Sequence, residues 1–135
     1  MIEGKCICGE VRVTLAQRPD YINICNCRLC RSSGAAWGYF SPEQVQVDGK
    51  AETFRRTDID PAVIDLHFCP KCSSVSHYTI DESYGSDRVG VNTRIFSQAD
   101  LDGVEVRYLD ARNVSSEEDV YQLTGDGHIG DGKAF

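Results

Sequence analysis

The segment Phe68-Cys69-Pro70-Lys71-Cys72 places two cysteines three positions apart near the middle of the 135-residue chain. Two further cysteine groups precede it, Cys6-Ile7-Cys8 near the start and Cys25-Asn26-Cys27-Arg28-Leu29-Cys30 further along. Residues at these spacings can aim their sulfurs at one ion, because tetrahedral zinc with Zn–S bonds of about 2.3 Å needs sulfurs about 3.8 Å apart. The spacing therefore predicts zinc ligands, and unliganded core cysteines are the less economical alternative.

The seven cysteines divide most simply into a group of four and a group of three. Zinc closed by four cysteines is structural, whereas zinc held by three protein ligands keeps a fourth position for water or substrate. We predict an open site at the sequence-near triple Cys25, Cys27 and Cys30. The remaining cysteines then form the closed site: Cys6, Cys8, Cys69 and Cys72. A zinc ribbon is the competing partition, which spacing alone does not exclude; it would use Cys27, Cys30, Cys69 and Cys72.

Composition and charge limit the class of protein. Hydrophobic residues make up 41% and charged residues 26% of the chain, values typical of one globular domain over residues 1–135. The formal net charge of −7 disfavours nucleic acid and membrane surfaces as partners. No apolar run reaches the roughly 18 residues of a membrane helix, and residues 1–6 do not resemble a signal peptide. We therefore expect a cytoplasmic protein whose cysteines bind metal instead of forming disulfides.

Short strands dominate the predicted secondary structure. Alternating apolar residues at Val11, Val13 and Leu15 predict a half-buried strand. Similar runs, separated by Gly, Pro, Asp or Ser, predict strands over 21–24, 35–40, 45–47, 53–55, 63–68, 75–80, 89–96 and 104–109. Only single helical turns are expected, at 41–43 and 97–101. We predict a mainly-β fold with several short antiparallel strands, little helix and a loop over the glycine-rich tail 125–135.

The three cysteine motifs resemble those of a known family in order and spacing. Gly4-Lys5-Cys6-Ile7-Cys8-Gly9-Glu10-Val11, Cys25-Asn26-Cys27-Arg28-Leu29-Cys30-Arg31 and Phe68-Cys69-Pro70-Lys71-Cys72 are similar to motifs of the glutathione-dependent formaldehyde-activating enzyme family, which is grouped with the centromere protein V domain. The resemblance covers the chain from Gly4 to about Leu109. It implies a zinc-bound β-tent domain with a structural zinc at the four-cysteine group and a catalytic zinc at Cys25, Cys27 and Cys30.

The resemblance also implies a reaction. An open three-cysteine zinc can bind a thiol such as glutathione, lower its pKa and orient it toward an aldehyde such as formaldehyde. The expected activity is that of a carbon–sulfur lyase, which forms or cleaves an S-hydroxymethyl adduct. Glutathione carries two carboxylates, so cations are expected near the metal, and Arg28 and Arg31 flank the triple. Three other arginines lie elsewhere in the sequence and are weaker candidates, since exposed charge is the default: Arg55, Arg56 and Arg94.

Aromatic and histidine residues are candidates for the pocket wall. Trp37, Tyr39 and Phe40 follow the triple on a predicted strand, and at least one of them is expected to belong to the core. His67 lies two positions before Cys69, but a lone histidine beside a strand is more often structural than catalytic. We predict no catalytic role for it or for the other two histidines, His77 and His128.

Two other functional classes compete with the enzyme. A zinc-stabilised binding module would use its metal for structure only and would tolerate loss of the three-cysteine site. A thiol redox protein would use Cys25, Cys27 and Cys30 as exchangeable thiols. Two zinc ions, one of them labile, would favour the enzyme, whereas one tightly bound zinc would favour either rival.

Overall fold

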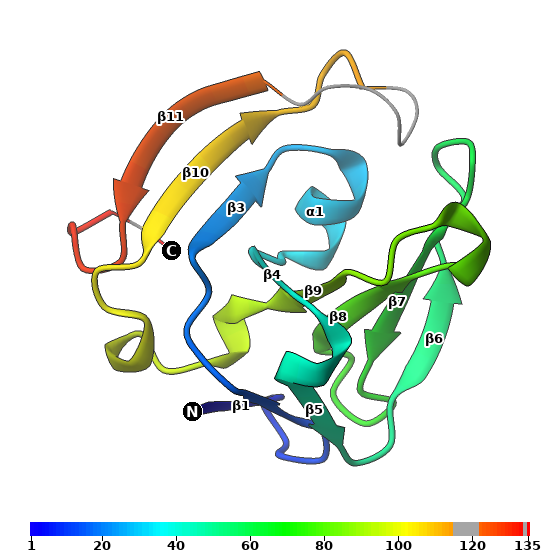
Figure 1. Cartoon of the computed structure of the whole chain (residues 1–135), viewed down its shortest axis with the longest axis horizontal. Coiled ribbons are helices and arrows are strands. Elements are labelled where there is room, and N and C mark those ends of the chain that lie inside the picture. The colour runs from blue at the N-terminus through cyan, green and yellow to red at the C-terminus, as the bar shows by residue number, and fades with distance from the viewer. Residues whose placement is uncertain (115–121, 134) are drawn as a thin grey trace.

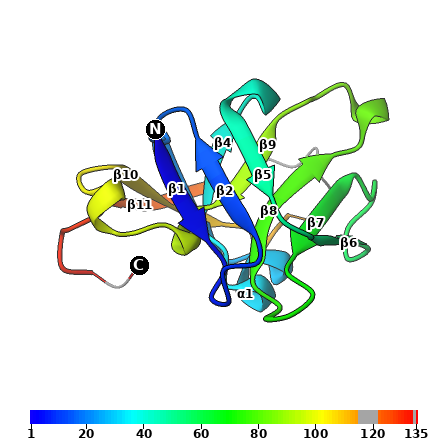
Figure 2. The ribbon, with the colours of Figure 1, turned by 90° about the horizontal axis from the view of Figure 1, so that it is seen from below.

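Two β-sheets form the framework of the fold, and the computed structural model describes residues 1–114, 122–133 and 135 of the chain. The smaller sheet is antiparallel and consists of β1 (Ile2–Lys5), β2 (Arg12–Leu15) and β5 (Val45–Asp48), in that order (Figure 2). The larger sheet has eight strands in the order β11 (Gln122–His128), β10 (Glu105–Asp110), β3 (Tyr21–Cys25), β4 (Trp37–Phe40), β9 (Val89–Asn92), β8 (Val75–Ile80), β7 (Ile64–Phe68) and β6 (Glu52–Arg55). The predicted mainly-β class is confirmed.

The larger sheet curves around the helix α1 (Arg28–Ser33), so that β10 and β11 lie on one side of it and β6 and β7 on the other (Figure 1). Its neighbouring strands are antiparallel with one exception, because β3 and β10 run parallel. Cys25 at the end of β3 therefore lies opposite Leu109 near the end of β10. The parallel pair brings the residues that follow both strands to the same edge of the sheet.

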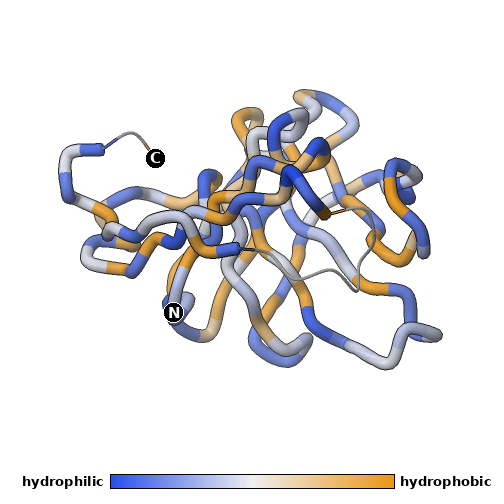
Figure 3. Tube along the Cα trace, turned by 90° about the horizontal axis from the view of Figure 1, so that it is seen from above, coloured by the Kyte–Doolittle hydropathy of each residue, from blue (hydrophilic) through white to orange (hydrophobic). Residues whose placement is uncertain are grey.

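The main core lies between the two sheets. Val13 and Leu15 on β2 are fully buried, whereas Arg12 on the same strand is exposed, as the pleat of a half-buried strand requires. The residues of the larger sheet in the same core include Ile22, Phe40, Val91 and Val106. Hydrophobic and hydrophilic residues alternate along much of the trace in Figure 3. A second buried cluster, made of Leu29, Cys30, Ala35, Trp37 and Tyr78, packs α1 against the concave side of the larger sheet.

Helix α1 is only six residues long and is bounded by two caps. Cys27 precedes it, and the Cys27 Sγ accepts the backbone N–H of Cys30 at 3.4 Å. Gly34 ends it with a φ of 67°, a left-handed conformation that glycine adopts without steric cost. The apolar pattern does not predict this helix, because six residues are too few to show a helical period. Within the described residues, no helix has the length and apolar character needed to cross a membrane.

Most predicted strands form with small changes at their ends. The strand expected over 89–96 stops at Asn92, whose Oδ1 accepts the backbone N–H groups of Ala36 and Arg94 and begins a 3-10 turn over Thr93–Ile95. The two expected helical turns are present as 3-10 turns, at Pro42–Gln44 and Ala99–Leu101. Strand β1 has no counterpart among the predictions.

The expectation of a loop over 125–135 is wrong for residues 125–128. These residues belong to β11, which pairs with β10 from Glu105 opposite His128 to Asp110 opposite Gln122. Glycine weakens the intrinsic preference for a strand, but the open edge of β10 offers backbone partners that do not depend on side chains. The chain leaves the strand only after His128 and turns at Gly130, which has a φ of 95°.

Candidate metal centre and adjoining pockets

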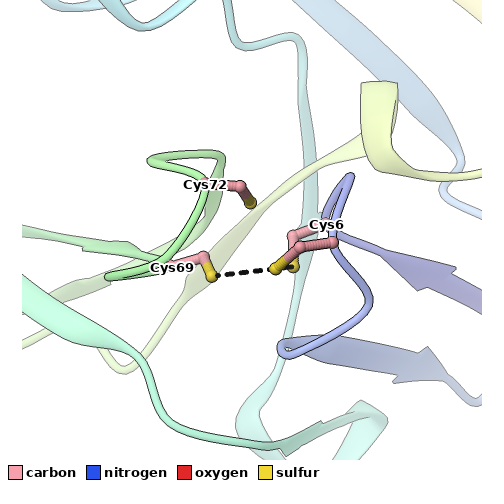
Figure 4. A group of neighbouring side chains, drawn as sticks. Cys6, Cys69 and Cys72 are labelled. Carbon is pink, nitrogen blue, oxygen red and sulfur yellow. Dashed lines mark hydrogen bonds between the residues drawn. The ribbon is translucent and has the colours of Figure 1, made fainter.

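Four cysteines from two distant turns meet in space. Cys6 and Cys8 lie in the turn between β1 and β2, and Cys69 and Cys72 lie in the turn between β7 and β8. Their four sulfurs all lie within 4.8 Å of one another, and the Cys8 Sγ is 3.6 Å from the Sγ atoms of Cys6 and Cys69. Figure 4 shows Cys69 and Cys72 pointing from one turn toward Cys6 on the other. The predicted four-cysteine group is thus assembled.

Polar contacts around this group favour the thiolate form of Cys6 and Cys72 and hold the two turns together. The backbone N–H of Val11 donates to the Cys6 Sγ at 3.2 Å. The hydroxyl of Ser74 lies 3.3 Å from the Cys72 Sγ, and this hydrogen bond is the main reason that the pKa of Cys72 falls to about 5. Lys71 in the second turn forms an ion pair with Glu10, which follows the first turn.

The other three cysteines come from one short segment. Cys25 ends β3, Cys27 caps α1, and Cys30 lies in the first turn of the helix. Their sulfurs also lie within 4.8 Å of one another, and those of Cys27 and Cys30 are 3.1 Å apart. The backbone N–H of Cys27 donates to the Cys25 Sγ at 3.3 Å, and the indole Nε1 of Trp37 donates to the Cys30 Sγ at 3.2 Å. Among the described residues, the zinc-ribbon partition does not form.

The charge balance of the triple fits a bound cation. Hydrogen bonds from Cys25 and Cys30 lower the pKa of Cys27, so one of the three thiols ionises easily. The same contact with Cys27 raises the pKa of Cys25 to about 11, and contacts with Cys25 and Cys27 raise that of Cys30. Three neighbouring thiolates repel one another unless a cation shares their charge. Both donor sets, all sulfur and closely spaced, could bind zinc.

An arginine-lined cleft opens beside Cys27. Its volume is about 560 Å³, and Arg28 and Arg31 of α1 lie in its wall. Both side chains belong to exposed residues, and neither forms an ion pair among the described residues. The Arg31 Nε donates to the carbonyl of Asn26 at 2.9 Å, which holds this side chain over the N-terminal end of the helix. The structure therefore brings both predicted arginines to the three-cysteine group.

Two further arginines reach the same cleft from other elements. Arg56 follows β6 and is only 4% exposed, and its Nε and Nη2 bind the carboxylate of Asp58 at 2.8 and 2.7 Å. Its charge also contributes to the low pKa of Cys27. Arg112, in the segment after β10, also lines the cleft, and its Nη2 lies 2.6 Å from the Asp110 Oδ2.

Arg56 lies near the triple, although its place in the sequence made it a weaker candidate than Arg28 and Arg31. Residues 56 and 27 are far apart in the sequence, and only the curvature of the larger sheet brings them together. The other two arginines lie elsewhere: Arg55 pairs with Asp65 and Asp81, and Arg94 packs over the ring of Phe135.

Asn26 joins the triple to the end of β10. Its Nδ2 donates to the Asp110 Oδ1 at 2.9 Å, and its Oδ1 accepts the backbone N–H of Ala111 at 2.7 Å. These contacts follow from the parallel pairing of β3 and β10, which places the two chain segments side by side. Asn26 therefore has a structural role between Cys25 and Cys27.

An aromatic pocket of about 340 Å³ adjoins the triple and is lined by all three of its cysteines. Its aromatic wall consists of Tyr21, Trp37, Tyr39 and Tyr78. Trp37 is buried and packs edge-on against Tyr78, with ring centroids 4.9 Å apart. Phe40, by contrast, belongs to the main core, which confirms that one of the three aromatics after the triple is not in the pocket.

The histidines lie outside both pockets. The ring of His67 stacks on that of His77 at a centroid distance of 4.2 Å, and its two ring nitrogens contact Thr53 and Thr79. These contacts are those of structural residues on β6, β7 and β8.

Comparison with known proteins agrees with these motifs. Residues 1–108 match the family described as "Glutathione-dependent formaldehyde-activating enzyme". The chain belongs to this family. The match includes all seven cysteines of the two groups and ends just before Leu109. No curated protein matches the chain.

A solved structure shares the fold of this family member. The crystal structure of a Rhodobacter sphaeroides protein from a structural genomics programme superposes with a TM-score of 0.59 at 21% sequence identity. The superposition covers 71% of this chain and 88% of that chain. This similarity supports the fold and carries no information on substrates.

Proposed function

We propose that the chain is a zinc-dependent carbon–sulfur lyase that joins a small thiol, such as glutathione, to an aldehyde, such as formaldehyde, at the open site of Cys25, Cys27 and Cys30. The observation that carries the proposal is the convergence of three sulfurs from one segment, bordered by a cleft that contains Arg28 and Arg31. Membership in the family supports the thiol and aldehyde classes. In this proposal, the four-cysteine group binds the structural zinc.

The residues of the triple hold the metal, and their neighbours hold the thiol. Zinc bound by three cysteines leaves a fourth position at which a thiol binds as the thiolate, the nucleophilic form. The N–H groups of Cys27 and Trp37 donate to the Cys25 and Cys30 sulfurs and would hold these two ligands in place around a bound zinc. Arg28 and Arg31 supply donors for a carboxylate of the thiol in the adjoining cleft.

One observation favours the thiol redox alternative. The Cys27 and Cys30 sulfurs are 3.1 Å apart, so that in metal-free protein an oxidant could join them. Metal analysis separates the two functions: two zinc ions per chain, one of them removed by a mild chelator, support the lyase. One tightly bound zinc with a readily formed Cys27–Cys30 disulfide supports the redox protein.

Calorimetric titration of the zinc-loaded protein with glutathione tests the thiol site. We expect saturable binding, weakened about tenfold in Arg28→Ala or Arg31→Ala, because each change removes a charged hydrogen bond. Arg12→Ala, on the exposed face of the smaller sheet, is the matched control and should bind as the wild type does. Absence of heat at millimolar glutathione, or equal binding in all four proteins, would remove this mechanism.

A further inference from the structure

The aromatic pocket is much larger than formaldehyde needs. Water occupies about 30 Å³ in the liquid, so a molecule of two non-hydrogen atoms fills roughly 60 Å³. The pocket measures about 340 Å³, within the range that small organic ligands fill. With formaldehyde bound, water would fill most of this volume. Contact between that water and the apolar faces of the aromatic rings is unfavourable.

The walls of the pocket favour a neutral, flat ligand. Besides the four aromatic rings, the apolar side chains of Leu29, Ile64 and Leu109 face it. Among the described residues that line it there is no carboxylate or lysine, and both arginines that reach it are engaged. Arg56 binds Asp58, and the guanidinium of Arg88 lies 4.6 Å from the centroid of the Tyr39 ring. The carboxylates of a thiol such as glutathione are therefore better matched by the arginine-lined cleft, which also borders Cys27.

One end of the pocket carries polar groups suited to a carbonyl oxygen. The Asn23 Nδ2 donates to the Tyr39 hydroxyl at 2.9 Å, which leaves the hydroxyl proton of Tyr39 to point elsewhere. Burial raises the pKa of Tyr39 to about 12, so the hydroxyl keeps this proton at neutral pH. Among the described residues, the buried Oδ1 of Asn23 has no partner; as an acceptor it can take a hydrogen bond from a water molecule, whereas the carbonyl oxygen of a ligand needs the donor that the Tyr39 hydroxyl supplies.

We propose that the aromatic pocket binds an aldehyde with an aromatic substituent, with its ring among Tyr21, Trp37 and Tyr78 and its carbonyl oxygen at the Tyr39 hydroxyl. This inference rests on the proposed thiol–aldehyde function and specifies its aldehyde. The thiolate sulfur attacks the carbonyl carbon, a C–S bond forms, and the C=O π bond breaks toward oxygen. The oxygen takes the hydroxyl proton of Tyr39, and Tyr39 is reprotonated by the proton that the thiol released. The product of thiol and aldehyde is therefore the hydroxy thioether, with no other reactant consumed.

The single tryptophan of the chain allows binding to be measured without turnover. Trp37 lies in the pocket wall, so its fluorescence should change when a ring enters. The probes are benzyl alcohol and methanol, the unreactive alcohols that correspond to benzaldehyde and formaldehyde. With zinc-loaded protein, we expect a saturable change with benzyl alcohol and none with methanol at the same concentration.

Variants that fill the pocket test the location. Ile64→Phe should weaken benzyl alcohol binding at least tenfold, and Leu109→Phe provides a second test if the first variant folds poorly. Leu123→Phe adds the same ring to an exposed position on β11 and should bind as the wild type does. The ratio of kcat/KM for benzaldehyde to that for formaldehyde, with glutathione as thiol, should fall about tenfold in the filled variants only.

The outcomes separate the pocket from the reaction. Turnover of formaldehyde without any saturable binding of benzyl alcohol would overturn the aromatic aldehyde and leave the lyase in place. Equal binding by Ile64→Phe, Leu109→Phe and Leu123→Phe would overturn the location. Binding of benzyl alcohol without turnover of either aldehyde would keep the pocket as an aromatic site and remove the lyase, and with it the aldehyde identity.

Discussion

Ser73 is the only described residue other than glycine with a positive φ, 62°. It follows Cys72, and its backbone N–H donates to the carbonyl of Cys69 at 2.8 Å, which closes the turn that carries both cysteines. A left-handed conformation costs residues with a Cβ about 1–2 kcal/mol. The turn therefore carries local strain in order to aim the Cys69 and Cys72 sulfurs at the first two cysteines.

Replacing Ser73 by glycine should stabilise the protein. Relief of the steric cost, less the roughly 0.5–1 kcal/mol that glycine adds to the entropy of the unfolded chain, leaves a gain of about 0.5–1 kcal/mol. Thermal unfolding of zinc-loaded protein should show a higher Tm for Ser73→Gly. Ser73→Ala keeps the Cβ and loses the hydroxyl, so it serves as the control. If the glycine variant melts no higher than the alanine variant, the strain is not present.

The two cysteine groups differ in the elements that they join. The four-cysteine group links the turn after β1 to the turn after β7, segments about half the chain apart. The triple lies within β3 and the start of α1 and crosslinks almost no chain. Loss of metal should therefore have different consequences at the two positions.

Cys69→Ser should unfold the protein, whereas Cys27→Ser should remove one metal and leave the fold. Structural zinc sites contribute on the order of 10 kcal/mol of apparent binding free energy, comparable to the stability of a whole domain. The measurements are circular dichroism for folding and metal analysis for zinc content. A cooperative, wild-type-like melting transition in Cys69→Ser would refute the structural role. Loss of both metals in Cys27→Ser would show that the two groups are not independent.

Acid stability of the whole molecule should depend on His77. This residue is 7% exposed, and burial lowers its pKa to about 3, against about 6.5 in an unfolded chain. The unfolded state therefore binds more protons between these two values. The stability that neutral His77 supports is complete above pH 6.5 and decreases as the pH falls toward 3, by about 1.4 kcal/mol per pH unit.

His77→Gln should remove this part of the pH dependence. Chemical unfolding of both proteins at several values between pH 7 and pH 5 should give a shallower decrease for the variant. Zinc release in acid and the lowered pKa of His67 affect both proteins, so the difference between their slopes is the measured quantity. Parallel curves would mean that His77 is not titrating on unfolding.

The sequence alone indicated the strand-rich class, the family and the division of the cysteines into four and three, whereas the structure excluded the zinc-ribbon partition that spacing had left open. Cysteines two or three positions apart are constrained by local backbone geometry, which sequence spacing displays directly. The alternation of Val11, Val13 and Leu15 likewise reflects the pleat of a single strand. Arg28 and Arg31 were predictable beside the triple because they share its short segment.

Tertiary structure alone decided what surrounds the triple. Tyr78 on β8 and Arg56 just after β6 reach it from segments that are distant in the sequence, and nothing in those segments marks them. The parallel pairing of β3 with β10 brings Asn26 to Asp110, although short β-rich sequences give no signal for a parallel pair. Strand β11 forms because β10 offers an unpaired edge, whereas its own glycines indicate a loop. Local patterns report local geometry, but a pocket depends on how separate elements pack, and packing is a property of the whole chain.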